Sequence, residues 1–148
     1  MEENKSNILN LMVAHHALLD ALFALFRDQI RDGSPSSRVS LSELIWETNK
    51  HFFVEERAIF DFVPLENYGV LGTINQLKDE HITMLNDLKK FAEKLPEVKS
   101  EDMDNFHKSL ESHRQVEEKD LYPKLDKELP EEQKKEIVAR INEIPLTK

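Results

Sequence analysis

Cysteine is absent from the 148-residue sequence, and glycine occurs only three times. Without cysteine the chain has no disulfide, no catalytic thiolate and no sulfur ligand for a metal. The scarcity of glycine and of β-branched residues, beside abundant Leu, Glu, Lys and Asp, favours helices over strands. We expect an all-α protein with a single domain over residues 1–148, because a chain of this length buries a substantial core.

Basic residues are also in the minority, since 20 Lys and Arg face 29 Asp and Glu for a net charge of −9. Nucleic acids and anionic membrane surfaces attract basic proteins, so we expect neither as a partner. The apolar stretch at 8–26 follows an acidic segment, lacks a cleavage pattern and contains four polar side chains: Asn10, His15, His16 and Asp20. We interpret it as a buried amphipathic helix of a cytoplasmic protein rather than a signal or membrane segment.

Apolar residues recur at helical spacing in long segments that are separated by turn-forming residues. The predicted helices run over about 4–31, 40–63 and 70–95, then from about 103 to Pro123, with a shorter helix over about 131–144. Long helices with short connections predict an antiparallel up-down-up-down four-helix bundle over about 4–125, followed by a short fifth C-terminal helix.

Two segments share a pattern of a histidine followed by a glutamate four residues later: HFFVE at 51–55 and HRQVE at 113–117. The preceding helices also match each other around His15 and His81, so the chain resembles two copies of one helical hairpin. Four residues turn only about 40° around a helix, whereas five turn about 140°. Glu55 and Glu117 therefore share the inward faces of their histidines, whereas Glu56 and Glu118 are expected to face sideways or outward.

The first helix contains two adjacent histidines, and only one can lie on its apolar seam. The predicted seam comprises Ile8, Leu11, His15, Leu18, Leu19, Leu22, Leu25 and Phe26. His16 is about 100° from His15 around the helix, so we assign His15 to the interior. In an antiparallel bundle His15, His51, His81 and His113 then meet at one level of the core.

Two buried carboxylates with no buried Lys or Arg at matching positions would repel each other and lose their hydration. Metal cations remove that difficulty, and imidazole with carboxylate suits a pair of first-row transition ions. The candidate metal ligands are His15, His51, Glu55, His81, His113 and Glu117. Iron is the preferred metal, with manganese or zinc as alternatives.

A lone inward histidine is more often an ordinary core residue than a ligand, but the repetition of the whole pattern favours the metal. Other polar residues are interpreted as surface groups or as supports of the ligands: His16, Glu56, His107 and Glu118. The aromatic residues nearby are interpreted as packing or as the lining of the site: Trp46, Phe52, Phe53, Phe60 and Tyr122.

With these residues in place, the sequence resembles the hemerythrin-like, or HHE cation-binding, family. The family pattern is a His on the first helix, HxxxE on the second, a His on the third and HxxxE on the fourth, often continuing to EExxLFP. Here the last segment continues as EKDLYP at 118–123. The resemblance implies two iron ions bridged by Glu55, Glu117 and a shared oxo or hydroxo group. It leaves room for a small ligand such as dioxygen, nitric oxide or peroxide.

One departure bears on the function. Oxygen-carrying hemerythrins have two histidines four residues apart on the third helix, whereas leucines, Leu77 and Leu85, flank His81 at that spacing. The four-His, two-Glu set is more similar to bacterial members linked to repair of iron centres under nitrosative stress or to iron and redox sensing. The leading hypothesis is a di-iron protein that binds or reduces a small ligand. The alternatives are an iron or redox sensor without turnover and a metal-free helical interaction protein.

Overall fold

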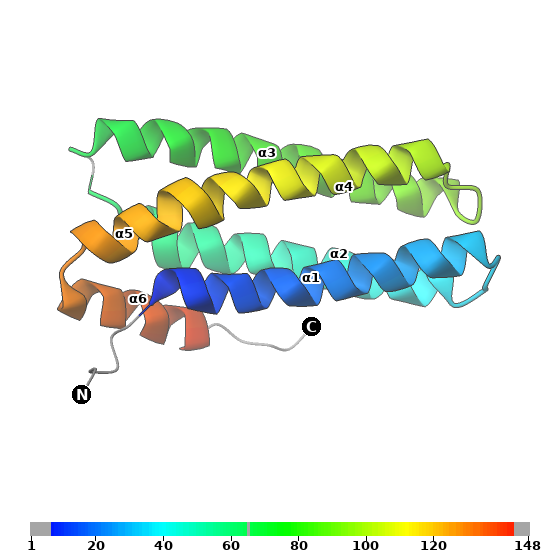
Figure 1. Cartoon of the computed structure of the whole chain (residues 1–148). Helices are drawn as coiled ribbons and strands as arrows, with labels where there is room; N and C mark the ends of the chain where they lie inside the picture. Colours follow the sequence, from blue (N-terminus) through cyan, green and yellow to red (C-terminus); the bar gives the residue numbers. More distant parts are fainter. Residues whose placement is uncertain (1–6, 65, 144–148) are drawn as a thin grey trace.

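Four long helices pack side by side in the computed structural model, which describes residues 7–64 and 66–143 (Figure 1). They are α1 (Ile8–Arg31), α2 (Ser37–Val54), α3 (Tyr68–Lys94) and α4 (Ser100–Gln115), followed by the shorter α5 (Tyr122–Glu128) and α6 (Glu131–Glu143). The part of the chain that the structure describes contains no strand. The predicted all-α bundle with a short C-terminal helix is confirmed, and the predicted helix ends near residues 4 and 144 lie outside the described residues.

Two helices contain wide turns that the sequence did not indicate. A π-helical segment, η1 (Glu55–Ile59), continues α2 and leads into a 3-10 turn, η2 (Phe60–Phe62). A second π-helical segment, η3 (Val116–Leu121), joins α4 to α5. The prediction that the fourth helix ends at Pro123 is wrong, because this proline lies in the first turn of α5, where its missing N–H is not needed.

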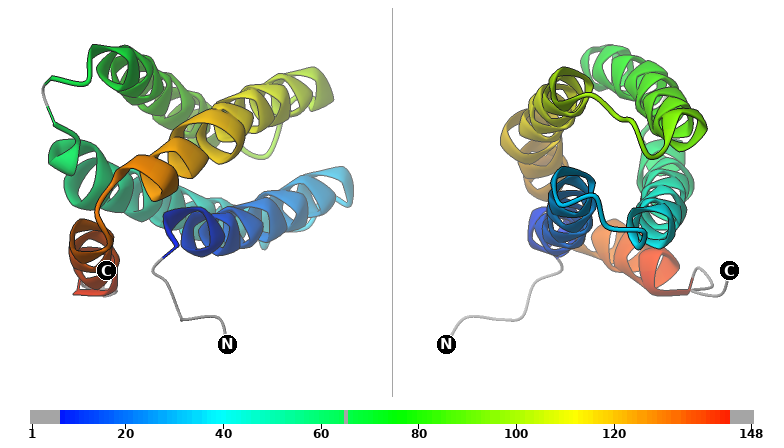
Figure 2. Two further views of the ribbon diagram at one scale, coloured as in Figure 1. Left: turned by 60° about the vertical axis from the view of Figure 1, so that its left-hand side comes forward. Right: turned by 90° about the vertical axis from the view of Figure 1, so that its right-hand side faces the viewer.

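The four long helices form a ring when viewed from the end, and α6 lies outside the ring against α1 and η1 (Figure 2). The carboxylate of Asp126 on α5 accepts hydrogen bonds from the backbone N–H groups of Ile8 and Leu9, at 2.8 and 3.1 Å. These bonds satisfy two of the donors left free at the start of α1. By length and composition alone α1 could cross a membrane, but here it packs against α2 and α5 as a bundle helix.

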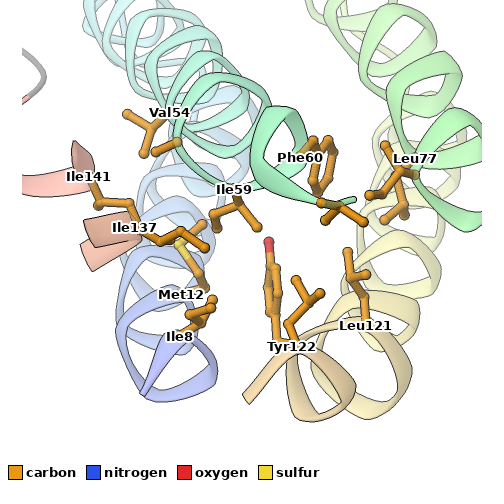
Figure 3. Close-up of a cluster of buried hydrophobic side chains, with 14 of the residues drawn as sticks. Ile8, Met12, Val54, Ile59, Phe60, Leu77, Leu121, Tyr122, Ile137 and Ile141 are labelled. Atoms are coloured by element: carbon orange, nitrogen blue, oxygen red, sulfur yellow. The ribbon is translucent and has the colours of Figure 1, made fainter. Parts of the chain in front are cut away.

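Two apolar clusters fill the bundle, one on each side of a polar layer. The α6-side cluster comprises Ile8, Met12, Val54, Ala58, Ile59, Phe60, Val63, Val70, Ile74, Leu77, Leu121, Tyr122, Leu125, Ile137 and Ile141 (Figure 3). The distal cluster comprises Phe23, Phe26, Leu41, Leu44, Phe52, Met84, Leu88, Phe91, Val98, Met103, Phe106 and Leu110. The buried histidines and glutamates lie between the two clusters along each helix.

The face that α1 buries differs from the predicted seam. Its buried residues are Ile8, Met12, His16, Leu19, Phe23 and Phe26. Leu18 and Leu25, which were predicted to be buried, are 49% and 47% exposed. Apolar residues surround most of α1, so hydrophobic periodicity gave no unique inward face, and the true face is rotated by about one residue. This rotation decides which histidine of α1 enters the core.

Candidate metal centre

Four imidazoles and two carboxylates converge in the polar layer of the bundle. All six side chains are buried: His16, His51, Glu55, His81, His113 and Glu117. They form two overlapping groups that share both glutamates, and within each group the potential ligand atoms all lie within 4.8 Å of one another. One group adds His16 and His51 to the glutamates, and the other adds His81 and His113. The layer therefore contains two adjacent positions with two imidazoles each.

Each carboxylate directs one oxygen toward each histidine pair. Glu117 places Oε1 3.2 Å from Nε2 of His16 and Oε2 3.3 Å from Nε2 of His113. Glu55 places Oε1 2.8 Å from Nε2 of His81 and Oε2 3.5 Å from Nε2 of His51. Each carboxylate would thus be able to supply one oxygen to each of the two positions if metal ions were bound there.

Most of these converging atoms make no hydrogen bond within the described residues. The buried atoms without a partner include Nε2 of His81 and His113, Oε1 of Glu55 and both carboxylate oxygens of Glu117. They are close together but are not aligned as donor and acceptor. The ion pairs of the two glutamates involve only histidines, with no Lys or Arg in the described chain. Such orphaned polar atoms are costly, and a cation placed among them satisfies both imidazole nitrogens and carboxylate oxygens.

Three of the four imidazoles are held from behind by a carboxylate. Nδ1 of His16 lies 2.5 Å from Glu118, Nδ1 of His81 lies 2.7 Å from Glu56, and Nδ1 of His113 lies 2.8 Å from Glu80. A carboxylate that accepts the Nδ1–H proton fixes the tautomer in which Nε2 is free to bind a metal, and it makes that nitrogen a stronger donor. The same arrangement recurs around metal-bound histidines in general.

The π-helical segments position the glutamates and the residues that follow them. A π-turn joins residues five apart, and the N–H groups of Phe60 and Tyr122 bond to the carbonyls of Glu55 and Glu117. The wide turn therefore places each aromatic residue on the inward face of its helix, one turn after a glutamate. The hydroxyl of Tyr122 points toward the interior (Figure 3) and donates a hydrogen bond to Oε2 of Glu55. Insertions of this kind are common at functional sites.

The pKa values of the two buried carboxyl groups are shifted in opposite directions when no metal is bound. Burial and the neighbouring charge of Glu55 raise the pKa of Glu117 well above its ordinary value. Burial also acts to raise the pKa of Glu55, but the close side chains of Glu117, His51 and His81 outweigh it and leave that pKa well below the ordinary value. Two carboxylates this close repel each other, so the metal-free pair favours the form that shares one proton and one negative charge.

Burial keeps two of the imidazoles neutral near pH 7. It lowers the pKa of His16 to about 3, and it lowers the pKa of His113 as well. Burial also opposes a charge on His81, but the carboxylates of Glu55 and Glu56 outweigh it and raise that pKa. Neutral imidazole is the form that binds metals, so His16 and His113 need lose no proton to act as ligands.

The structure brings together five of the six predicted ligands: His51, Glu55, His81, His113 and Glu117. The assignment of His15 is corrected, because His16 occupies the cluster in its place. His15 lies at the edge of the bundle, and the centroid of its ring is 5.9 Å from that of His51. As predicted, His107 lies apart from the cluster and stacks on Phe23, with 5.7 Å between ring centroids.

Three further residues of the site were missed or misjudged from the sequence. His16 was interpreted as a surface or supporting residue and Glu80 was not singled out. Tyr122 was interpreted as packing or as the lining of the site, without a hydrogen bond to a ligand. The spacing of five residues between Glu117 and Tyr122 points away from the site in an α-helix, so only a π-turn reveals this contact. Glu56 and Glu118, by contrast, are half-buried and support histidines. They had been interpreted either as surface groups or as supports of the ligands.

Comparisons with known proteins agree with this site. Comparison with curated proteins and with solved structures gives no match. A family model described as the hemerythrin HHE cation binding domain matches residues 7–125, which include all four long helices and both glutamates. The matched region also contains both groups of potential ligands, so the buried cluster is a metal-binding site. The chain belongs to the hemerythrin HHE cation-binding domain family.

Proposed function

We propose that this protein is a cytoplasmic non-haem di-iron protein that binds or reduces a small ligand: dioxygen, nitric oxide or peroxide. The observation that carries the proposal is the pair of carboxylates, each of which directs one oxygen to each histidine pair. Two such carboxylates favour two neighbouring metal positions over one. Imidazole and carboxylate without sulfur favour iron or manganese, whereas zinc can occupy such a site adventitiously.

The number of ligands supports binding of a further small molecule. Each position receives two imidazole nitrogens and two carboxylate oxygens, which is four protein donors. Iron in non-haem sites commonly accepts additional ligands, and these open positions are where dioxygen chemistry takes place when the metal is bound. The side chains of this protein would hold the metals, exclude bulk water and leave room for a diatomic molecule or peroxide.

Access to the layer supports the same proposal. A groove of about 560 Å³ between α3 and α4 is lined by residues that include Glu80, Met84, Ser112 and His113. Its lining thus includes a proposed ligand, His113, and the residue that supports this ligand, Glu80. A small molecule in this groove would lie beside His113, one of the proposed ligands.

The test is anaerobic loading with Fe²⁺, followed by metal analysis and exposure to each small molecule. We expect two iron ions per chain and new absorption bands after addition of air or nitric oxide. Glu117→Ala is expected to remove both results, and the control His107→Ala is expected to keep them, because His107 lies outside the cluster. Repeated consumption of peroxide or nitric oxide would identify an enzyme, whereas stabilisation without turnover would identify a sensor. Well under one iron per chain would contradict the proposal.

A further inference from the structure

The two hairpins of the bundle supply matching halves of the metal layer. His16 and His51 come from α1 and α2, whereas His81 and His113 come from α3 and α4. Four residues of the first hairpin each correspond to one residue of the second. The corresponding pairs are His16 and His81, His51 and His113, Glu55 and Glu117, and Glu56 and Glu118. The contacts correspond in the same way, because Glu118 supports His16 and Glu56 supports His81. Each residue of one half therefore has an identifiable counterpart in the other.

One support breaks this correspondence. Glu80 immediately precedes His81 and lies 2.8 Å from Nδ1 of His113. The counterpart of Glu80, immediately before His16, is His15. Nδ1 of His51 is buried and has no hydrogen-bond partner among the residues that the structure describes. Thus three imidazoles are backed by a carboxylate, and the fourth, that of His51, faces a neighbouring imidazole and a cavity of about 70 Å³.

A second difference between the hairpins affects the same metal position, the one at His16 and His51. Tyr122 follows Glu117 by five residues, as Phe60 follows Glu55, and their rings lie 6.5 Å from His16 and 6.0 Å from His81, between centroids. Only Tyr122 has a hydroxyl, which donates to Oε2 of Glu55, the oxygen directed at His51. A hydrogen bond makes a carboxylate oxygen less basic and so a weaker metal donor. Phe60 makes no such bond on the opposite half.

We propose that the two metal positions are inequivalent, so that the position at His81 and His113 fills first and the position at His16 and His51 fills second. The inference rests on the proposed metal centre and adds an order of loading to it. A carboxylate behind a ligating histidine is worth about 10- to 100-fold in metal affinity. We therefore expect the second position to bind at least about ten-fold more weakly, which leaves a one-metal form populated between the two steps.

The direct test follows the imidazole nitrogens by ¹⁵N NMR while Zn²⁺, a diamagnetic probe, is added to the metal-free protein. At one Zn²⁺ per chain we expect the Nε2 resonances of His81 and His113 to shift while those of His16 and His51 stay near their metal-free values. The second equivalent is expected to shift the remaining pair. Parallel shifts of all four histidines, or earlier shifts of His16 and His51, would overturn the proposed order.

A substitution that should raise metal affinity tests why one metal position fills before the other. His15→Glu places a carboxylate at the counterpart of Glu80, so we expect the weaker binding step to tighten by about ten-fold while the tighter step changes little. Val13→Glu is the matched control, because it adds the same charge to an exposed position of the same helix. Glu80→Gln is expected to do the opposite and weaken the tighter step by about 10-fold or more.

The outcomes separate this inference from the proposed function. If His15→Glu leaves the weaker step unchanged, or if Val13→Glu tightens it equally, the missing carboxylate is not the cause of the difference. If Glu80→Gln weakens only the second step, the order is reversed. If the wild-type protein binds less than one Zn²⁺ and less than one Fe²⁺ per chain, the metal centre itself fails rather than its asymmetry.

Discussion

The apolar clusters and the polar layer between them are built on the same four helices, yet they contribute to stability in different ways. In the clusters, apolar side chains fill the interior and are almost fully removed from water. In the layer, two carboxyl groups are completely buried, and several of their oxygens and facing nitrogens lack hydrogen bonds among the described residues. Burial favours the clusters and opposes the layer. The layer is therefore maintained for what it binds and not for the stability of the metal-free fold.

Glu117→Gln is expected to separate binding from folding most strongly. The raised pKa of Glu117 favours its neutral form in the metal-free protein, and a neutral amide of similar size resembles that form closely. We expect the free energy of unfolding without metal to change by less than about 1 kcal/mol. Stabilisation by metal, about 4 kcal/mol at a free concentration about 1,000-fold above Kd, should be lost. Chemical denaturation with and without Fe²⁺, under anaerobic conditions, measures both quantities.

Leu88→Ala in the distal cluster should have the converse effect. Leu88 is fully buried, and its truncation removes apolar contacts and leaves a cavity. We expect a loss of about 3 kcal/mol in the free energy of unfolding, in both the metal-free and the metal-bound protein. The difference between the two forms should stay as in the wild type. A variant that lost its metal stabilisation as well would show that the clusters and the layer are energetically coupled.

Glu56→Gln tests the support of a ligand rather than a ligand itself. Its carboxylate lies 2.7 Å from Nδ1 of His81 and is half-exposed, so the fold should tolerate the change. We expect metal affinity to fall by about 10- to 100-fold. Competition with a chelator measures the affinity, and Glu111→Gln is the control, because Glu111 pairs with His107 outside the layer. Equal affinities of the two variants would count against a role for the outer carboxylates.

Metal affinity should rise with pH. The pKa values of Glu117 and His81 are raised in the metal-free protein, so both groups keep their protons to higher pH and a metal must displace them. As the pH increases through these pKa values, less proton displacement is needed and binding strengthens. We expect about a ten-fold gain per pH unit for each proton released. Calorimetry in buffers of different ionisation enthalpy counts the protons, and a count of zero would contradict the assigned protonation states.

On α2, α3 and α4 the spacing of the apolar residues and the spacing of the histidines and glutamates indicate the same inward faces. The sequence therefore predicted most of the fold and of the site. On these helices the predicted ligands His51, His81 and His113 are buried, as expected. The prediction failed on α1, where apolar residues lie on several faces and the predicted seam ran through His15 rather than His16. It also missed the hydrogen bond from Tyr122 to Glu55, because α-helical spacing does not describe a π-turn. The contact of Glu80 with His113 depends on how α3 packs against α4, which local pattern does not encode.

The central claim is that the buried layer holds two metal ions on four histidines and two glutamates. Its most direct test is the iron content of protein that has been loaded anaerobically with Fe²⁺ and then dialysed, measured by elemental analysis beside Glu55→Ala. We predict two iron ions per wild-type chain and close to none in the variant, because Glu55 belongs to both groups of ligand atoms. Less than one iron per wild-type chain, or equal iron in the two proteins, would contradict the claim.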